Sequence, residues 1–113
     1  MNTTTLYRPV NQKELDLIEQ SGYTKFPRRL PEQPIFYPVT NEAYAAQISI
    51  EWNVPAYGVG YVTKLEVDAE YLKKFTVENV GGEIHNELWI PSDELEEFNS
   101  NIIGNIVVIA RHP

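Results

Sequence analysis

The pattern of apolar and polar positions predicts short strands and short amphipathic helices that follow one another along the chain. Strands are expected where β-branched and aromatic residues cluster or alternate with polar ones. The predicted strands are residues 6–10, 35–39, 57–67 and 76–80, a segment within 81–91, and residues 106–110. Because the last run is continuously apolar, we expect it to be a central or well-covered strand.

The first predicted helix follows the first strand directly. Asn11 is expected to cap its N-terminus, with Glu14 as the partner in a capping box, and Gly22 is expected to end it. A shorter helical turn is predicted after Asp68, whose carboxylate is suited to cap the turn.

Two further helices are predicted from apolar residues at helical spacing. The second helix is expected to begin at Asn41 and to end at Pro55, and its spacing places Trp52 in the core. The third is expected to begin with Ser92 as its cap and to stop at Gly104. Helical elements are thus predicted on both sides of the strand at residues 57–67.

The predicted elements mix strands and helices without a regular βαβ repeat. This order predicts one α+β domain over residues 1–113, with a mixed or mostly antiparallel sheet and about three short helices. No Gly-x-Gly-x-x-Gly segment joins a strand to a helix, which disfavours a Rossmann-type fold. Gly58 and Gly60 lie at the start of a strand and indicate a bulge or a close backbone approach.

Residues 21–34 are expected to form a semi-rigid surface loop, because proline resists both helix and central strand. The loop contains Pro27, Pro31, Pro34, Lys25, Arg28 and Arg29. Two interpretations of its positive charge stay open. The loop is a solvated connection, or Arg28 or Arg29 meets an anionic ligand or covers a cleft.

Composition and charge narrow the classes of function. Nine basic and sixteen acidic residues give a formal charge of −7, which argues against general binding to nucleic acid or to an anionic membrane. The absence of cysteine excludes disulfides, zinc-thiolate sites and cysteine nucleophiles. No signal peptide is visible, nor an apolar run of the roughly 20 residues that a membrane span needs. We therefore expect a soluble cytoplasmic protein, with export by a dedicated machine as the alternative.

Residues 81–91 hold the main candidates for chemistry. A glycine pair leads into an apolar, β-prone segment that carries His85 and Glu87, with Trp89 two residues further on. Because strand side chains alternate between faces, these side chains are expected to share a face. That face is either a reaction site or a solvated strand edge, since an unpaired carboxylate is costly to bury. Arg8 has two interpretations as well: it packs along a surface carboxylate or it binds phosphate.

Other catalytic arrangements lack the residues that they need. His85 and His112 are the only histidines, so we expect no metal site. The chain contains no Gly-x-Ser-x-Gly turn for a serine hydrolase and no Gly-x-x-x-x-Gly-Lys loop for phosphate.

Three segments together resemble the ADP-ribosyltransferase fold family, in the small form labelled ADP-ribosylation/crystallin J1-like. Residues 6–8, Leu-Tyr-Arg, are similar to the family's first strand, where an aromatic residue precedes the arginine that contacts NAD. Residues 35–37, Ile-Phe-Tyr, resemble the strand that walls the nicotinamide pocket. Residues 87–91, Glu-Leu-Trp-Ile-Pro, resemble the final motif, where the catalytic glutamate precedes an apolar strand and a proline.

The resemblance implies an NAD-dependent mono-ADP-ribosyltransferase, an enzyme of the glycosyltransferase class that releases nicotinamide. In that role Glu87 stabilises positive charge on the ribose, and His85 acts as a base or hydrogen-bond donor. The residues that the resemblance assigns to NAD binding are Arg8, Tyr7, Tyr37 and Phe36. NAD is then a substrate, no metal takes part, and the acceptor is expected to be a protein.

An alternative from another class is a non-catalytic, immunity-type module of the same fold that recognises a protein partner. Glu94, Glu96 and Glu97 lie close together on the third predicted helix and offer a basic partner a negative surface. A solvated helix face explains the same pattern. A third interpretation is a purely structural α+β protein in which Glu87 is exposed.

Overall fold

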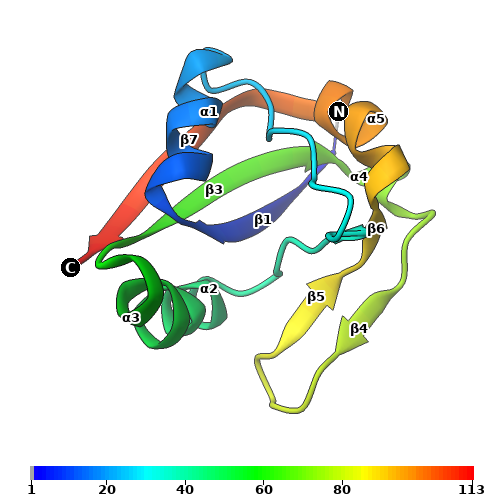
Figure 1. The fold of residues 1–113 in the computed structure, drawn as a ribbon. Helices are drawn as coiled ribbons and strands as arrows, with labels where there is room; N and C mark the ends of the chain where they lie inside the picture. Colours follow the sequence, from blue (N-terminus) through cyan, green and yellow to red (C-terminus); the bar gives the residue numbers. More distant parts are fainter. Residues whose placement is uncertain (1) are drawn as a thin grey trace.

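The computed structural model describes residues 2–113, and its elements follow the predicted order of strands and helices (Figure 1). The strands are β1 (Thr3–Val10), β2 (Ile35–Phe36), β3 (Gly60–Asp68), β4 (Val77–Asn79), β5 (Asn86–Leu88), β6 (Ile90–Pro91) and β7 (Ile102–His112). The helices are α1 (Gln12–Gln20), α2 (Glu42–Ile48), α3 (Val54–Tyr57), α4 (Ala69–Leu72) and α5 (Leu95–Ser100), with a π-helical segment η1 (Ser49–Asn53) and a 3₁₀ turn η2 (Ser92–Glu94). The α+β class is confirmed.

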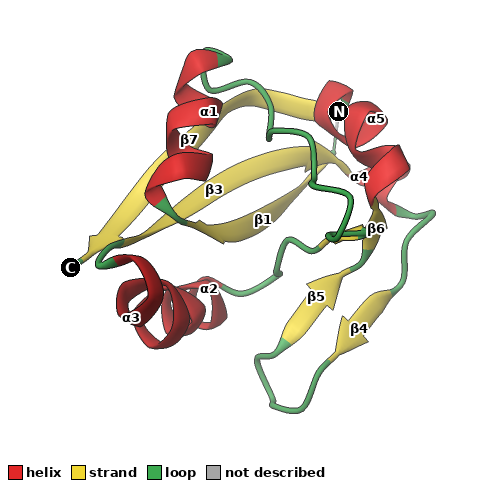
Figure 2. Cartoon of the chain, viewed as in Figure 1, coloured by secondary structure: helices red, strands yellow, loops and turns green. Residues whose placement is uncertain are grey.

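Antiparallel strand pairs form the framework of the protein (Figure 2). β3 lies at the centre of a three-stranded sheet in the order β1-β3-β7, while β2 pairs with β6 and β4 pairs with β5. The residue that links these parts is Val39, which forms isolated antiparallel bridges to both Tyr7 and Glu87. The chain at Val39 therefore connects β1 to β5.

The buried apolar side chains form two groups. The larger group joins β1, β3 and β7 to α1, α5 and the β2–β6 pair, and its fully buried members include Leu6, Phe36, Phe98 and Leu65. The smaller group lies under α2 and consists of Val39, Tyr44, Ala45 and Val62. Phe36 belongs to the larger group and Val39 to the smaller one, so apolar burial stabilises both ends of residues 36–39.

The second helical region is longer and more irregular than its sequence predicts. Pro55 does not end it, because η1 leads from α2 into α3 and Pro55 lies in the first turn of α3. The wide π-helical turn before the proline accommodates a residue that has no N–H to donate. The prediction that Trp52 is a core residue is wrong: its side chain is 71% exposed. The π-helical turn breaks the 3.6-residue spacing on which that prediction depended.

The C-terminal part of the chain also differs from two predictions. β7 is an edge strand, not a central one, and Val107, Val108 and Ile109 are exposed. Ser92 makes no side-chain capping bond, and it begins a 3₁₀ turn that precedes α5. The helix ends at Ser100, so Gly104 lies inside β7, where its positive φ of 78° accompanies an irregular register with β3.

The predicted close approach of backbones is confirmed at Gly60 but not at Gly58, which ends α3 with a φ of 82° and has no atom within 4 Å of a Cβ position. A Cβ atom at Gly60 would lie 2.9 Å from the carbonyl oxygen of Ser49. Ser49 is fully buried, and its hydroxyl lies 2.8 Å from Nδ1 of His112. The glycine therefore lets the start of β3 pack directly against η1, which fixes the α2 region beside the sheet.

Candidate functional site

Glu87 lies in the middle of β5 and is 8% exposed. Its neighbour Leu88 enters the larger hydrophobic group, and the alternation of strand side chains turns Glu87 toward α2. The bridge between Glu87 and Val39 holds the backbone in place, supported by a 3.0 Å bond from the Leu88 N–H to the Pro38 carbonyl. Of the two interpretations of Glu87, the solvated strand edge therefore does not apply.

Two neutral donors hold the Glu87 carboxylate. The Tyr44 hydroxyl donates to Oε2 at 2.6 Å, and the Trp89 indole Nε1 donates to Oε1 at 2.8 Å. Within residues 2–113 no basic side chain forms an ion pair with Glu87. The carboxylate is thus buried, oriented by hydrogen bonds, and not neutralised by a cation.

His85 lies beside Glu87 on the same face, as the spacing predicts. Its ring stacks on Tyr44 with 4.5 Å between centroids and 28° between planes. Its Nε2 lies 3.0 Å from Oε1 of Gln47. Gly82 is required beneath it, because a Cβ atom there would lie 2.6 Å from His85 Nδ1. Tyr44 therefore contacts both predicted catalytic residues, one through its ring and the other through its hydroxyl.

Tyr44 and Gln47 are parts of the site that the sequence did not reveal. Asn41 caps α2 by accepting a 3.2 Å bond from the Tyr44 N–H, which sets the helix so that Tyr44 faces β5. Burial and the hydrogen bond to Glu87 raise the pKa of Tyr44 above its ordinary value. The phenol is therefore a permanent donor at neutral pH. Because residues three apart share a helix face, the spacing of Tyr44 and Gln47 could have indicated that both side chains face the same site.

Arg8 is also buried, but it belongs to a second group of residues. Its Nε and Nη2 donate to the Glu14 carboxylate at 2.7 and 3.1 Å. Its Cζ lies 4.6 Å from the ring centroid of Phe36 and 5.7 Å from that of Tyr37. The predicted capping box is therefore only half formed. Asn11 accepts from the Glu14 N–H at 2.8 Å, but the Glu14 side chain binds Arg8 instead of the cap.

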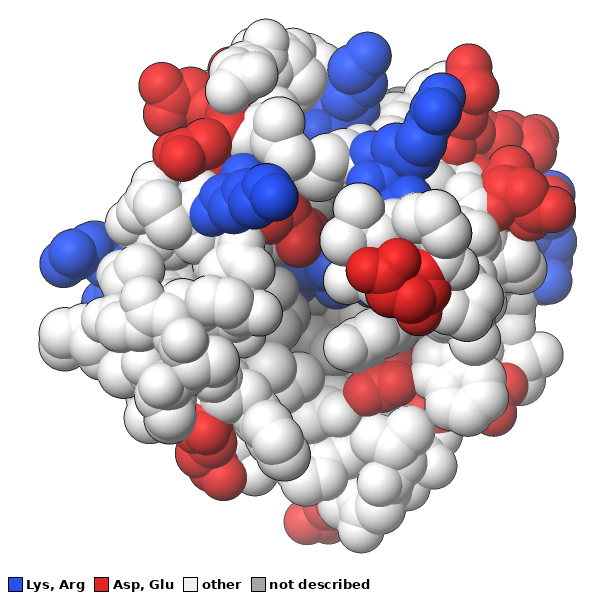
Figure 3. Space-filling model, in the orientation of Figure 1, with Lys and Arg blue, Asp and Glu red and all other residues white. Residues whose placement is uncertain are grey.

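Backbone pairing through Val39 connects the group around Arg8 to the group around Glu87. Tyr7 pairs with Val39 through two 2.8 Å hydrogen bonds, and Val39 in turn forms a bridge with Glu87. Arg8 adjoins Tyr7, so two strand spacings, roughly 10 Å, separate its backbone from that of Glu87. Figure 3 shows a hollow near the middle of the molecule as viewed, in the region between β1, α2 and β5 of Figure 1.

The aromatic residues predicted to bind NAD differ in exposure. Tyr37 is 40% exposed, so its ring is accessible to a ligand, whereas Phe36 is fully buried. Tyr7 is partly buried and packs against the smaller hydrophobic group. Of the three aromatic residues predicted to bind NAD, Tyr37 is the most exposed. The Phe36 ring packs against the Arg8 guanidinium.

A separate cavity of about 770 Å³ lies between α1, the loop at residues 21–34 and α5. Its walls carry charges of both signs: Lys25, Arg28 and Arg29 from the loop, Asp93 from η2, and Glu96 from α5. None of the predicted catalytic or NAD-binding residues lines it. The interpretation in which the basic loop covers a cleft is supported at this place.

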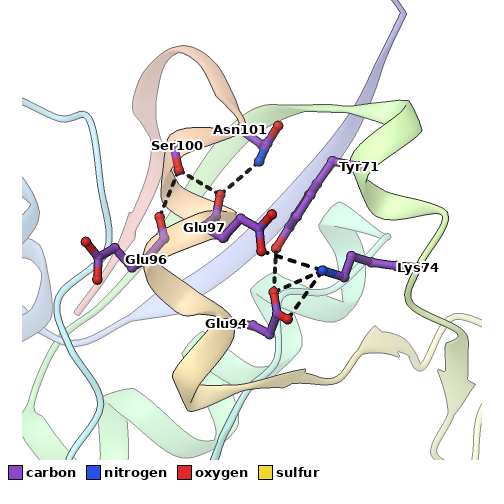
Figure 4. A network of polar contacts seen from close by, with 7 residues as sticks. All are labelled: Tyr71, Lys74, Glu94, Glu96, Glu97, Ser100 and Asn101. Carbon is purple, nitrogen blue, oxygen red and sulfur yellow. Dashed lines mark hydrogen bonds and ion pairs between the residues drawn. The ribbon is translucent and has the colours of Figure 1, made fainter.

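The predicted acidic face of α5 is partly neutralised within the chain (Figure 4). The ammonium group of Lys74 lies 3.2 Å from Glu94 and 3.6 Å from Glu97, and the Tyr71 hydroxyl lies 3.5 Å from Glu94. The bond between Lys74 and Glu94 raises the pKa of the lysine and lowers the pKa of the glutamate. One lysine balances only one of these two carboxylates, so Glu94, Glu96 and Glu97 together with Lys74 keep a net charge of −2.

Two features are absent from the described residues. No helix in residues 2–113 has both the length and the apolar character to cross a membrane. The same part of the chain gathers no group of three or more His, Cys, Asp or Glu side chains that could hold a metal ion.

Comparisons of the chain with protein-family models, with curated proteins and with solved structures find no match in any of the three.

Proposed function

We propose that this protein transfers ADP-ribose from NAD to an acceptor and releases nicotinamide. The observation that carries this proposal is the state of Glu87, a carboxylate that is 8% exposed, held on both oxygens by neutral donors and unpaired with any cation in residues 2–113. Such a group is suited to meet positive charge that develops in a transition state.

The proposed reaction develops positive charge that Glu87 would stabilise. As the bond between the nicotinamide nitrogen and the ribose carbon breaks, its electron pair leaves with nicotinamide and positive charge develops on the sugar. A fixed carboxylate in a site of low water content stabilises this charge more than water does. The acceptor then forms a bond to the same carbon and loses a proton. Tyr44 and Trp89 hold the carboxylate still, so little reorganisation is needed.

The other residues of the site have supporting roles in this proposal. Arg8 binds the phosphates of NAD through charge-assisted bonds, and the open ring of Tyr37 packs against a planar part of the ligand. Phe36 is fully buried and supports the Arg8 guanidinium. His85, stacked on Tyr44, serves as the base or hydrogen-bond donor toward the acceptor. The acceptor class that we propose is protein.

Transfer from labelled NAD to proteins of a host lysate tests this function. We expect labelling with the wild-type protein, a loss of at least about 100-fold with Glu87→Gln, and no loss with Glu83→Gln. Glu83 is the matched control because it is exposed and lies four residues before Glu87. Equal labelling by both variants would show that Glu87 is not catalytic.

NAD binding provides a second measurement that does not depend on the acceptor. If millimolar NAD produces no transfer, no nicotinamide release and no shift in thermal unfolding, the transferase proposal should be dropped. The alternative, a non-catalytic module that binds a protein partner, would then remain. The pairing of Glu94 and Glu97 with Lys74 does not favour that alternative, because it reduces the negative surface of α5.

A further inference from the structure

Arg29 has a buried donor that nothing in the described chain satisfies. It lies in the proline-rich loop, is half-buried, and its Nε makes no hydrogen bond to any atom of residues 2–113. Buried donors without an acceptor are rare in folded proteins, because each loses its hydration without replacement. The position of this guanidinium therefore indicates that an acceptor from outside the chain belongs beside it.

Arg29 shares its aromatic support with Arg8. The Cζ atoms of Arg29 and Arg8 lie 5.9 and 4.6 Å from the ring centroid of Phe36. Burial and the charge of Arg8 lower the pKa of Arg29, whereas Glu14 and Tyr37 act in the opposite direction. Two like charges brought together in a partly buried place repel each other unless an anion lies between or beside them.

The chain supplies only part of the negative charge that this pair requires. Among residues 2–113, Glu14 is the one carboxylate that bonds to the pair, and it is occupied by Nε and Nη2 of Arg8. This pattern leaves Nη1 of Arg8 and Nε of Arg29 for another acceptor. Two guanidinium groups and one carboxylate give the cluster a charge of +1 within a protein of formal charge −7. A local positive site in an acidic protein is the arrangement expected for a specific anion site.

We propose that Arg29 and Arg8 together form a phosphate-binding site over Phe36, and that Arg29 is a substrate-binding residue of the transferase. The ligand group is a phosphate or pyrophosphate, because guanidinium forks bind such oxyanions through several charge-assisted bonds at once. That this group belongs to NAD rests on the proposed function. Arg28 lies outside this site: its side chain is exposed, and among residues 2–113 the guanidinium groups over Phe36 are those of Arg8 and Arg29.

Titration calorimetry with inorganic pyrophosphate, ADP-ribose and NAD tests the site without requiring activity. We expect Arg29→Gln to weaken binding of all three by at least about tenfold and Arg28→Gln to change it by less than about twofold. Adenosine and nicotinamide, which carry no phosphate, should bind equally to both variants. Pyrophosphate binding that is unchanged in Arg29→Gln would overturn the proposal.

Folding of the variants must be separated from their binding. Thermal unfolding of Arg29→Gln should show a single transition close to that of Arg28→Gln, and Arg29→Lys should recover part of the pyrophosphate binding through its charge. No recovery in Arg29→Lys together with a collapsed transition in Arg29→Gln would assign Arg29 a structural role and overturn the proposal.

The outcomes also distinguish this inference from the proposed function. Wild-type protein that binds pyrophosphate through Arg29 but transfers nothing from NAD would retain the phosphate site and contradict the transferase. Transfer from NAD with the same KM in Arg29→Gln as in the wild type would retain the transferase and contradict the role of Arg29.

Discussion

The Tyr44 hydroxyl of α2 donates a 2.6 Å hydrogen bond to Glu87 of β5, and the two residues lie 43 positions apart in the sequence. This bond joins the helical region to the hairpin that carries the candidate catalytic carboxylate. The Tyr44 ring also stacks on His85, so one side chain orients both residues. The geometry of the site is therefore a tertiary property that depends on how α2 docks against β5.

Removing the Tyr44 hydroxyl should separate the contribution of its hydrogen bond to Glu87 from that of its ring stacked on His85. We expect Tyr44→Phe to lower the free energy of unfolding by about 1–2 kcal/mol, because Oε2 of Glu87 loses its buried donor while the ring and its stacking remain. Urea unfolding measures the change. Tyr57→Phe is the control, since Tyr57 is 61% exposed, and it should change stability by less than about 0.5 kcal/mol. Equal effects from both substitutions would contradict the structural role of the bond.

The ion pair of Arg8 and Glu14 should be worth more than the surface pairs of this protein. Their side chains are only 7% and 16% exposed, so Glu14→Gln leaves a buried guanidinium without its counter-charge. We expect a loss of about 3 kcal/mol in the free energy of unfolding, measured in urea. The matched control is Glu70→Gln, which removes a pair with Lys73 whose side chains are 78% and 72% exposed, and which should lose less than about 1 kcal/mol.

A double-mutant cycle completes this experiment. Arg8→Ala and Glu14→Gln combined should cost less than the sum of the two single substitutions, because neither charge is then left buried alone. If the effects add within about 0.5 kcal/mol, the two side chains do not form the coupled pair that the structure shows.

The sequence predicted best those features that depend on neighbouring residues. Asn11, Asn41 and Asp68 each cap a helix as expected, because the accepting oxygen and the N–H it binds lie two or three residues apart. The α+β class followed from the order of such local elements. The shared face of His85 and Glu87 followed from the two-residue period of a strand.

The sequence did not predict features that depend on how the elements pack against one another. Glu14 looked like a capping-box residue because that motif is local, but the nearby Arg8 guanidinium is a stronger partner for its carboxylate. The apolar run in β7 looked central because composition does not report which strand lies at the edge of a sheet. The donor from Tyr44 to Glu87 required the docking of α2, which no local pattern encodes.

The two tryptophans provide a direct test of the finding that Trp52 is exposed and not a core residue. Trp52 is 71% exposed and Trp89 is 44% exposed, but only Trp89 donates a hydrogen bond to Glu87. Trp52→Phe should therefore change the free energy of unfolding by less than about 0.5 kcal/mol, whereas Trp89→Phe should lower it by about 1 kcal/mol or more. Urea unfolding of the two variants gives the comparison.

Fluorescence quenching supplies the control for this pair. In Trp89→Phe the remaining emission comes from Trp52, and iodide should quench it more effectively than it quenches the emission of Trp52→Phe. The opposite order would mean that Trp52 is a core residue after all.

The stability of the protein should fall at alkaline pH through Tyr44 and Tyr71. Burial, with the neighbouring carboxylates Glu87 and Glu94, raises the pKa of both phenols above the value of about 10 that they have in an unfolded chain. Between the unfolded and folded pKa values the native state holds protons that the unfolded state has lost, so the free energy of unfolding decreases as pH rises above about 10. Absorbance of phenolate during an alkaline titration should show that Tyr44 and Tyr71 ionise later in the native protein than in urea. Substitution of both residues by phenylalanine should remove this late fraction, and coincident native and unfolded titrations would contradict the burial of these two phenols.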